Sequence, residues 1–209
     1  SWNGYVYAHN NPLSKIDPDG FDPITIIVPG TFNDWDDWNS SLFKGWVKNT
    51  FGGDVVVVKW DGWDNKLMRS WVGKQLAAAI NDYAKKHPGE EINLVCHSHG
   101  CNVAFKALEG LRTSVKVNVL VSLGVPVRDD YKPKEEKIQQ HINVYSNHDA
   151  VQPNGGRIKF DPGMILGVSL LEFGPAGRTF NDSRVQNLDA SDWAKGHSEL
   201  WMKPGTWWN

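Results

Sequence analysis

The chain has 209 residues, and its 22 lysines and arginines against 24 aspartates and glutamates leave a formal net charge of −2. This length suits one domain with a sizeable core, and the near-neutral charge without a basic run argues against a nucleic-acid partner. The longest apolar stretch, Met164 to Leu171, is far too short to cross a bilayer, and no signal peptide is visible.

Residues 1–20 are rich in turn-forming residues and follow neither a helical nor a strand period. They contain a Tyr-x-Tyr-x-x-Asn-Asn-Pro-Leu stretch at positions 5–13 and then Asp-Pro-Asp-Gly at positions 17–20. This order of motifs resembles the end of the core domain of Rhs (rearrangement hotspot) proteins. The resemblance implies that the chain, which starts with Ser1, is a fragment of a longer polypeptide. Residues 1–20 would then end an Rhs-like core, and residues 21–209 would form the effector domain.

The same resemblance implies a biological role and partners. Rhs cores typically release the effector part by self-cleavage near the Asp-Pro-x-Gly motif, and this part is often a toxin. We therefore expect an antibacterial toxin that a bacterial secretion system, most often type VI, delivers into a target cell. Its expected partners are the Rhs core of the parent polypeptide and a cognate immunity protein.

Apolar runs and amphipathic stretches alternate from residue 21 onward. We predict strands at Ile24–Val28, Val55–Val58, Ile92–Val95, Val115–Leu123 and Ile142–Tyr145, an edge strand at Val185–Leu188, and helices at Lys66–Lys86 and Cys101–Leu111. This alternation predicts right-handed βαβ units, a mostly parallel sheet, and ligand chemistry at the carboxyl ends of the strands. The Gly- and Pro-rich segment Asn154–Thr179 receives no assignment, and whether it forms a lid stays open.

The run Cys96-His97-Ser98-His99-Gly100 joins a predicted strand to a predicted helix. A serine at the tip of such a turn exposes its hydroxyl at the sheet edge, beside the N-terminus of a helix. The positions two before and two after the serine must be small, because strand and helix pass close together there. Gly100 meets this demand, and Cys96 stands where a G-x-S-x-G turn usually has glycine. We expect Cys96 and Cys101 to be free thiols, because a strand end and a helix start point apart.

Polar residues that could carry hydrolytic chemistry follow the predicted strands: Thr31 the first, Ser98 the third, Asp149 the fifth and His197 the edge strand. The order Ser, Asp, His is that of α/β-hydrolases. Residues 21–209 resemble the lipases and esterases of this fold, although Cys96 replaces a glycine and Pro29-Gly30 replaces the frequent His-Gly. The resemblance implies an α/β-hydrolase fold, with a mostly parallel central sheet flanked by helices.

Ser98, His197 and Asp149 suit the roles of a catalytic triad. A serine hydroxyl is hardly ionised at neutral pH, so the neutral imidazole of His197 must accept its proton during attack and then pass it to the leaving alcohol. A carboxylate on the far side of the ring, that of Asp149, sets the tautomer and stabilises the imidazolium.

Two further groups of residues belong to the predicted site. The developing oxyanion is expected to meet the backbone N–H of His99 and that of Thr31 or Phe32. The side chains expected either to line the acyl pocket or to pack, on a loop, are Asp34, Trp35 and Trp38. The 11 tryptophans of the chain are interpreted mainly as packing residues, with an interfacial or acyl-chain-binding role as the alternative.

Other residues compete for two of the catalytic roles. The alternative acids are Asp129, Asp130 and Asp161. The alternative bases are His141 and His148. Asp149 is favoured because it directly follows a buried strand, and His148 is disfavoured because it adjoins Asp149 and neighbours at a strand end point apart.

The sequence therefore predicts a serine esterase that hydrolyses lipid carboxyl esters, with a phospholipase as the expected form. No cofactor is needed, and no metal is predicted, because His97, His99 and Cys101 lack further spaced ligands. Contact with a membrane surface would be transient. A smaller ester, a thioester or an amide stays open as the substrate. The other classes are a hydrolase-like module that binds without turnover and a nuclease toxin, against which the near-neutral charge argues.

Overall fold

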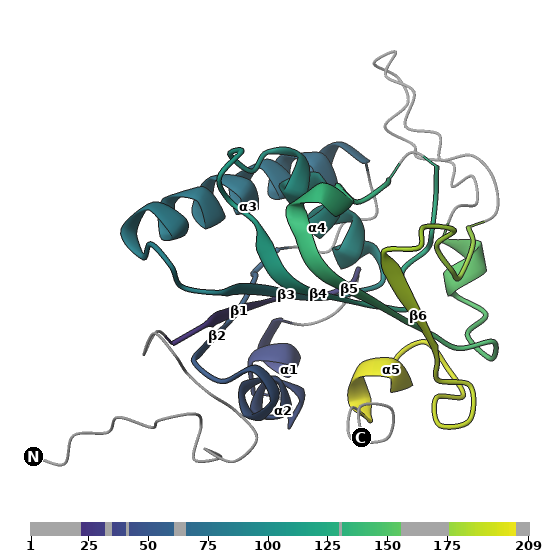
Figure 1. Cartoon of the computed structure of the whole chain (residues 1–209). Coiled ribbons are helices and arrows are strands. Elements are labelled where there is room, and N and C mark those ends of the chain that lie inside the picture. Colours follow the sequence, from purple (N-terminus) through teal and green to yellow (C-terminus); the bar gives the residue numbers. More distant parts are fainter. Residues whose placement is uncertain are drawn as a thin grey trace, which may run out of the picture.

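The computed structural model describes residues 22–31, 35–40, 42–60, 66–129, 131–155 and 176–203. Its strands are β1 (Ile24–Val28), β2 (Asp54–Val57), β3 (Ile92–His97), β4 (Val117–Leu123), β5 (Ile138–Tyr145) and β6 (Val185–Asp189). Within the described residues they form one parallel sheet in the order β2-β1-β3-β4-β5-β6 (Figure 1). Because all these strands run the same way, their carboxyl ends meet at one edge of the sheet.

Helices cover both faces of this sheet. They are α1 (Trp35–Ser40), α2 (Leu42–Phe51), α3 (Lys66–Lys86), α4 (His99–Glu109) and α5 (Glu199–Met202), with short 3-10 helices at Glu135–Lys137 and Gln152–Asn154. Helices α3 and α4 lie on one face, whereas α1, α2 and α5 lie on the other (Figure 1). The predicted α/β class, with a parallel sheet flanked by helices, is confirmed. None of the described helices is both long and apolar enough to cross a membrane.

The central strands are buried on both faces, which explains their unbroken apolar runs. In β1, Val28 joins the core under α3 and α4, whereas Ile27 joins the core on the opposite face. β3 alternates in the same way, with Leu94 in the first core and Val95 in the second. A strand that is covered on both faces has no solvent side that would call for polar residues.

The structure departs most from the predicted elements at β5 and over α1 and α2. β5 begins at Ile138 rather than at the predicted Ile142. The prediction missed its first half because exposed glutamines interrupt the apolar pattern there. Residues 35–38, expected in a loop, form most of α1, and α2 carries no sequence prediction. Asp36 and Asp37 lie in the first turn of α1, where acidic side chains favour a helix N-terminus. The prediction for α3, in contrast, has the observed bounds.

Candidate active site

Ser98 lies at the turn between β3 and α4 in a strained backbone conformation. Its φ is 53° and its ψ is −133°, and among the described residues it is the only non-glycine with a positive φ. Such a conformation costs about 1–3 kcal/mol and persists where the surrounding structure enforces it, commonly at functional sites. The Ser98 N–H donates to the Leu123 carbonyl at 2.9 Å. The turn is therefore held against the end of β4.

Gly100 shows why this turn needs a small residue after the serine. A Cβ atom placed on Gly100 would lie 2.2 Å from the carbonyl oxygen of Pro29 and 2.4 Å from that of Val28. Both oxygens belong to the backbone at the end of β1, so they cannot move aside as a flexible side chain could. Helix α4 therefore starts in close contact with the segment that leads to Thr31.

Cys96 and Cys101 form a disulfide bond across this turn. The expectation of free thiols is therefore wrong. The two Cα atoms are 4.8 Å apart, and both side chains belong to the core under α3 and α4. The turn is so tight that the start of α4 folds back over the end of β3, and the two side chains converge instead of pointing apart. The bond links the strand and the helix on either side of Ser98.

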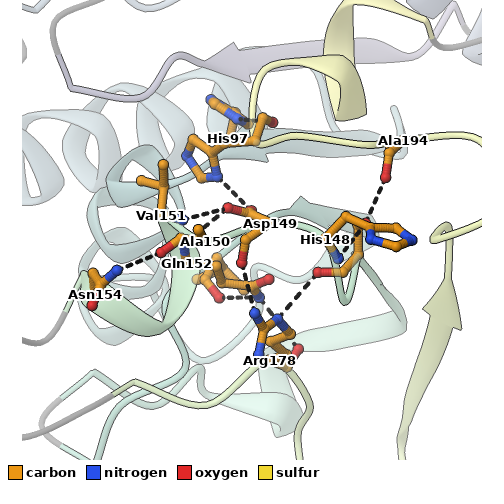
Figure 2. Close-up of polar contacts among 12 residues, drawn as sticks. His97, His148, Asp149, Ala150, Val151, Gln152, Asn154, Arg178 and Ala194 are labelled. Atoms are coloured by element: carbon orange, nitrogen blue, oxygen red, sulfur yellow. Dashed lines mark hydrogen bonds and ion pairs between the residues drawn. The ribbon is translucent and has the colours of Figure 1, made fainter.

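Asp149 follows β5 and is fully buried. Its Oδ2 lies 2.6 Å from Nδ1 of His197. Its Oδ1 accepts hydrogen bonds from the backbone N–H groups of Val151, at 2.8 Å, and Gln152, at 3.0 Å (Figure 2). The two carboxylate oxygens thus have separate partners, and Oδ2 is aimed at the imidazole. Hydrogen bonds to a carboxylate are charge-assisted and stronger than neutral ones.

Arg178 anchors the loop that carries Asp149 (Figure 2). Its Nε donates to the Ser146 carbonyl at 3.1 Å, and its Nη2 donates to the Asp149 carbonyl at 2.7 Å. On the opposite side, the Ser146 hydroxyl donates to the Ala194 carbonyl at 2.6 Å, which ties the loop to the segment that leads to His197. Sequence reasoning missed Arg178, because it lies in the segment without an assigned element and no motif marks it.

The end of β4 contacts both the Ser98 turn and the His197 ring. Leu123 binds the Ser98 N–H, and the next residue, Gly124, has a φ of 56°. A Cβ atom on Gly124 would lie 3.2 Å from Cε1 of His197, so the imidazole lies directly over this glycine. The ring centroid of His197 is also 4.5 Å from that of His97, the residue before Ser98.

His197 leaves one ring nitrogen uncommitted. Its Nδ1 faces Asp149, whereas its Nε2 is buried and makes no hydrogen bond within the described residues. Ser98, on the adjoining turn, is itself only 6% exposed. In general, a serine hydroxyl that reaches an imidazole whose far side is held by a carboxylate can become a nucleophile.

The other candidate bases lie elsewhere. His148 is exposed to solvent. His141 is buried, with the Ser122 hydroxyl 3.0 Å from its Nε2 and a Glu135 carboxylate oxygen 2.9 Å from its Nδ1. Because Ser122 is fully buried inside the sheet, this second Ser-His-carboxylate group is closed to any substrate.

Of the other candidate acids, the structure describes Asp129. Asp129 is exposed and pairs with Lys132 at 3.1 Å. Asp130 and Asp161 lie outside the described residues. Of the candidate acids that the structure describes, Asp149 is the one that contacts a candidate base.

The predicted oxyanion residues are described in part. His99 is the first residue of α4, so its backbone N–H belongs to the first turn of the helix. Thr31 follows closely on the end of β1 and is partly buried. Phe32, Asp34 and the side chain of Trp35 lie outside the described residues.

Trp38 belongs to the core under the turn. Its side chain is 1% exposed and stacks on Trp201 with 4.2 Å between ring centroids. It also contacts Phe43 edge-on at 5.3 Å and lies 5.7 Å from the ring of His97. These contacts agree with the packing role that was left open for Trp38.

Comparison with known proteins agrees with this architecture. The model of the serine hydrolase family matches residues 25–153, which is more than half of the chain. Aspergillus fumigatus lipase B has a TM-score of 0.57 at 15% identity, over 89% of this chain and 51% of that one. An acetyl xylan esterase has a TM-score of 0.50 at 14% identity, over 88% of this chain and 93% of that one.

A third similar structure is the phospholipase PlaB from Legionella pneumophila, with a TM-score of 0.39 at 16% identity over 49% of this chain. The chain spans 25% of the length of that phospholipase and 51% of the fungal lipase. No curated protein matches the sequence. The sheet order and the likeness to the fungal lipase and the acetyl xylan esterase establish the α/β-hydrolase fold. With its match over residues 25–153, the chain belongs to the serine hydrolase family.

Proposed function

We propose that this serine hydrolase is an esterase in which Ser98 is the nucleophile, His197 the base and Asp149 the acid. The observation that carries the proposal is the 2.6 Å contact between Asp149 and His197, beside a serine in a strained turn after β3. The family match supports hydrolysis as the reaction type. The order Ser, Asp, His along the chain agrees with the hydrolase fold.

In the proposed acylation step, Nε2 of His197 takes the hydroxyl proton while Oγ of Ser98 attacks the ester carbonyl carbon. The new C–O bond makes a tetrahedral intermediate, whose negative oxygen accepts hydrogen bonds from the N–H groups of His99 and of Thr31 or Phe32. The bond to the leaving alcohol then breaks, and His197 delivers its proton to that alcohol.

In the proposed deacylation step, a water molecule takes the place of the alcohol. His197 removes a proton from the water, the hydroxyl attacks the acyl carbon, and Ser98 leaves with the proton that His197 returns. Asp149 stays ionised in both steps and stabilises the imidazolium. Because Val151 and Gln152 hold Oδ1, Oδ2 stays directed at Nδ1 throughout.

We further propose that the ester belongs to a lipid, with a phospholipid as the specific expectation. A mostly apolar cavity of about 960 Å³ lies between α3 and the strands β1 and β2, a size at the upper end of small-ligand pockets. Trp60 in its lining donates to the Pro29 carbonyl at 2.9 Å, so one end adjoins the predicted oxyanion segment. Val56 and Trp71, also in the lining, are 48% and 60% exposed and could touch a membrane surface. Two neighbours of the same fold are named a lipase and an esterase.

The test of the esterase proposal uses the purified protein. Wild type is expected to hydrolyse p-nitrophenyl butyrate and to be labelled by a fluorophosphonate probe, and Ser98→Ala should abolish both. Activity that persists in folded Ser98→Ala would disprove the assigned nucleophile. Absence of turnover and labelling in the wild type would favour a module that binds without catalysis.

The test of the lipid proposal separates the substrate from the mechanism. Ala79 lines the cavity at an exposed position of α3. Ala79→Trp should therefore lower activity on long-chain esters and phospholipids while acetate-ester hydrolysis stays near wild type. If wild type and Ala79→Trp hydrolyse esters of every acyl-chain length at equal rates, the cavity does not bind the substrate. Mass spectrometry of cell lipids, wild type against Ser98→Ala, would then identify the headgroup cleaved, and unchanged lipids in both would contradict a phospholipase.

The role as an Rhs-associated antibacterial toxin is a separate proposal. It rests on the motifs at 5–13 and 17–20, which lie outside the described residues. It includes release from an Rhs core, delivery into a target cell by a bacterial secretion system, and a cognate immunity protein. Expression of residues 21–209 in bacterial cells should stop growth, and Ser98→Ala should relieve the arrest. Arrest of equal strength by the variant would argue against an enzymatic toxin.

A further inference from the structure

A buried histidine without a part in the proposed mechanism directly precedes the nucleophile. His97 is the last residue of β3 and is 2% exposed. Its Nε2 lies 3.2 Å from the backbone carbonyl oxygen of His197. The two rings are 4.5 Å apart between centroids, with an angle of 44° between their planes. His97 therefore touches both the backbone and the imidazole of the proposed base.

The hydrogen bond to His197 sets the tautomer of His97. A carbonyl oxygen only accepts, so Nε2 of His97 must carry the proton. In the neutral ring Nδ1 then has none, and this atom is buried without a hydrogen-bond partner within the described residues. An unsatisfied buried polar atom costs about 1–3 kcal/mol, a cost that a phenylalanine ring would avoid. Filling space therefore does not account for a histidine at this position.

The surroundings keep the His97 ring neutral. Burial lowers the pKa of His97 well below its usual 6.5, and repulsion from the His197 ring in its protonated form lowers it further. Within the part of the chain that the structure describes, the carboxylate that contacts this pair is that of Asp149, on the far side of His197. Trp38 of α1 packs against His97 at 5.7 Å and brings no charge. A second cation so near His197 would oppose the imidazolium that forms during catalysis, and a neutral ring avoids this.

We propose that His97 is a positioning residue for the general base. Its Nε2–H holds the backbone of His197, and its neutral ring supports the His197 ring so that Nε2 of the base faces Ser98. The inference rests on the proposed function. Because His97 and Ser98 are consecutive, a single turn places the nucleophile and holds the base. The positions of Ser98 and His197 are therefore coupled through this turn.

The test compares two substitutions in the otherwise intact chain. His97→Phe keeps an aromatic ring but loses the donor, whereas the side-chain amide of His97→Gln can donate near the place of Nε2. We expect His97→Phe to lower kcat on p-nitrophenyl butyrate about 10- to 100-fold with little change in KM, because misplacement of a catalytic group costs on this order. His97→Gln should recover most of the loss, and the rate of fluorophosphonate labelling should follow the same order. His87→Phe, at an exposed position just after α3, is the matched control.

The outcomes separate positioning from packing. Wild-type kcat in His97→Phe, or an equal loss in His97→Phe and His97→Gln, would overturn the proposal. If thermal unfolding shows that His97→Phe does not fold, His97→Asn replaces it, since its shorter amide cannot reach the His197 carbonyl and should stay impaired while His97→Gln is active. An inactive Ser98→Ala together with a fully active His97→Phe would refute the positioning role and leave the proposed esterase intact.

Discussion

Asparagine at position 149 would perturb the proposed base in a way that the local geometry makes specific. Val151 and Gln152 both donate backbone N–H bonds to Oδ1 of Asp149. In Asp149→Asn the amide oxygen must keep that place, because the NH2 group cannot accept these bonds. The NH2 group then replaces Oδ2, which lies 2.6 Å from Nδ1 of His197. Two donors face each other unless the His197 proton moves to Nε2.

The expected loss of activity follows from this change of tautomer. A His197 ring that is protonated at Nε2 cannot accept the Ser98 proton. In a well-studied Ser-His-Asp protease the same exchange lowers kcat about 10⁴-fold, or about 5.5 kcal/mol of transition-state stabilisation. Because position 149 is fully buried, water cannot supply the missing acceptor. The fold should tolerate the change, since the bonds to Oδ1 are kept.

The assay measures kcat and KM on p-nitrophenyl butyrate, with thermal unfolding as the check on folding. Asp129→Asn is the matched control, because Asp129 is exposed and pairs only with the exposed Lys132 among the described residues. The control should retain wild-type kcat. A folded Asp149→Asn protein that keeps more than about a tenth of the wild-type kcat would refute the tautomer reasoning.

Three further predictions concern stability. Reduction of the Cys96–Cys101 disulfide should lower the free energy of unfolding by about 2 kcal/mol for so short a loop, and equal urea midpoints with and without reductant would contradict this. Because the folded pKa of His97 is lowered, the unfolded chain binds more protons below the usual 6.5, so stability should fall as pH drops through 6.5. If the free energy of unfolding of His97→Gln depends on pH in the same way, His97 is not the cause of the pH dependence. Gly124→Ala should cost about 1–2 kcal/mol for its left-handed backbone and lower kcat by displacing His197, and an unchanged Tm would speak against it.

Local periodicity explains why much of the fold was predictable. The three-to-four spacing of apolar residues in Lys66–Lys86 requires only that one helix face be buried, and α3 has these bounds. The unbroken runs of β1 and β3 likewise indicate burial on both faces. α1 escaped prediction because it is one short stretch, whose stability comes from packing of Trp38 against Phe43 and Trp201.

Contacts between distant segments were not predictable in this way. Asp149 and His197 are 48 positions apart, and the residue order suggests their pairing without choosing among the other carboxylates. Arg178 reaches Ser146 and Asp149 from a segment with no motif. The disulfide between Cys96 and Cys101 shows the same limit at short range, because its formation depends on how sharply the turn folds back.

The amino-acid order alone establishes which residues could do hydrolytic chemistry and that each follows a strand. Side-chain type and local periodicity are properties of short stretches of chain, so they can be identified without knowledge of the fold. The burial of Asp149, its aim at His197 and the contact of His97 with the same ring depend on the sheet, which sets strands side by side that are remote in sequence. Those distances come from packing of the whole domain, and only the folded chain contains them.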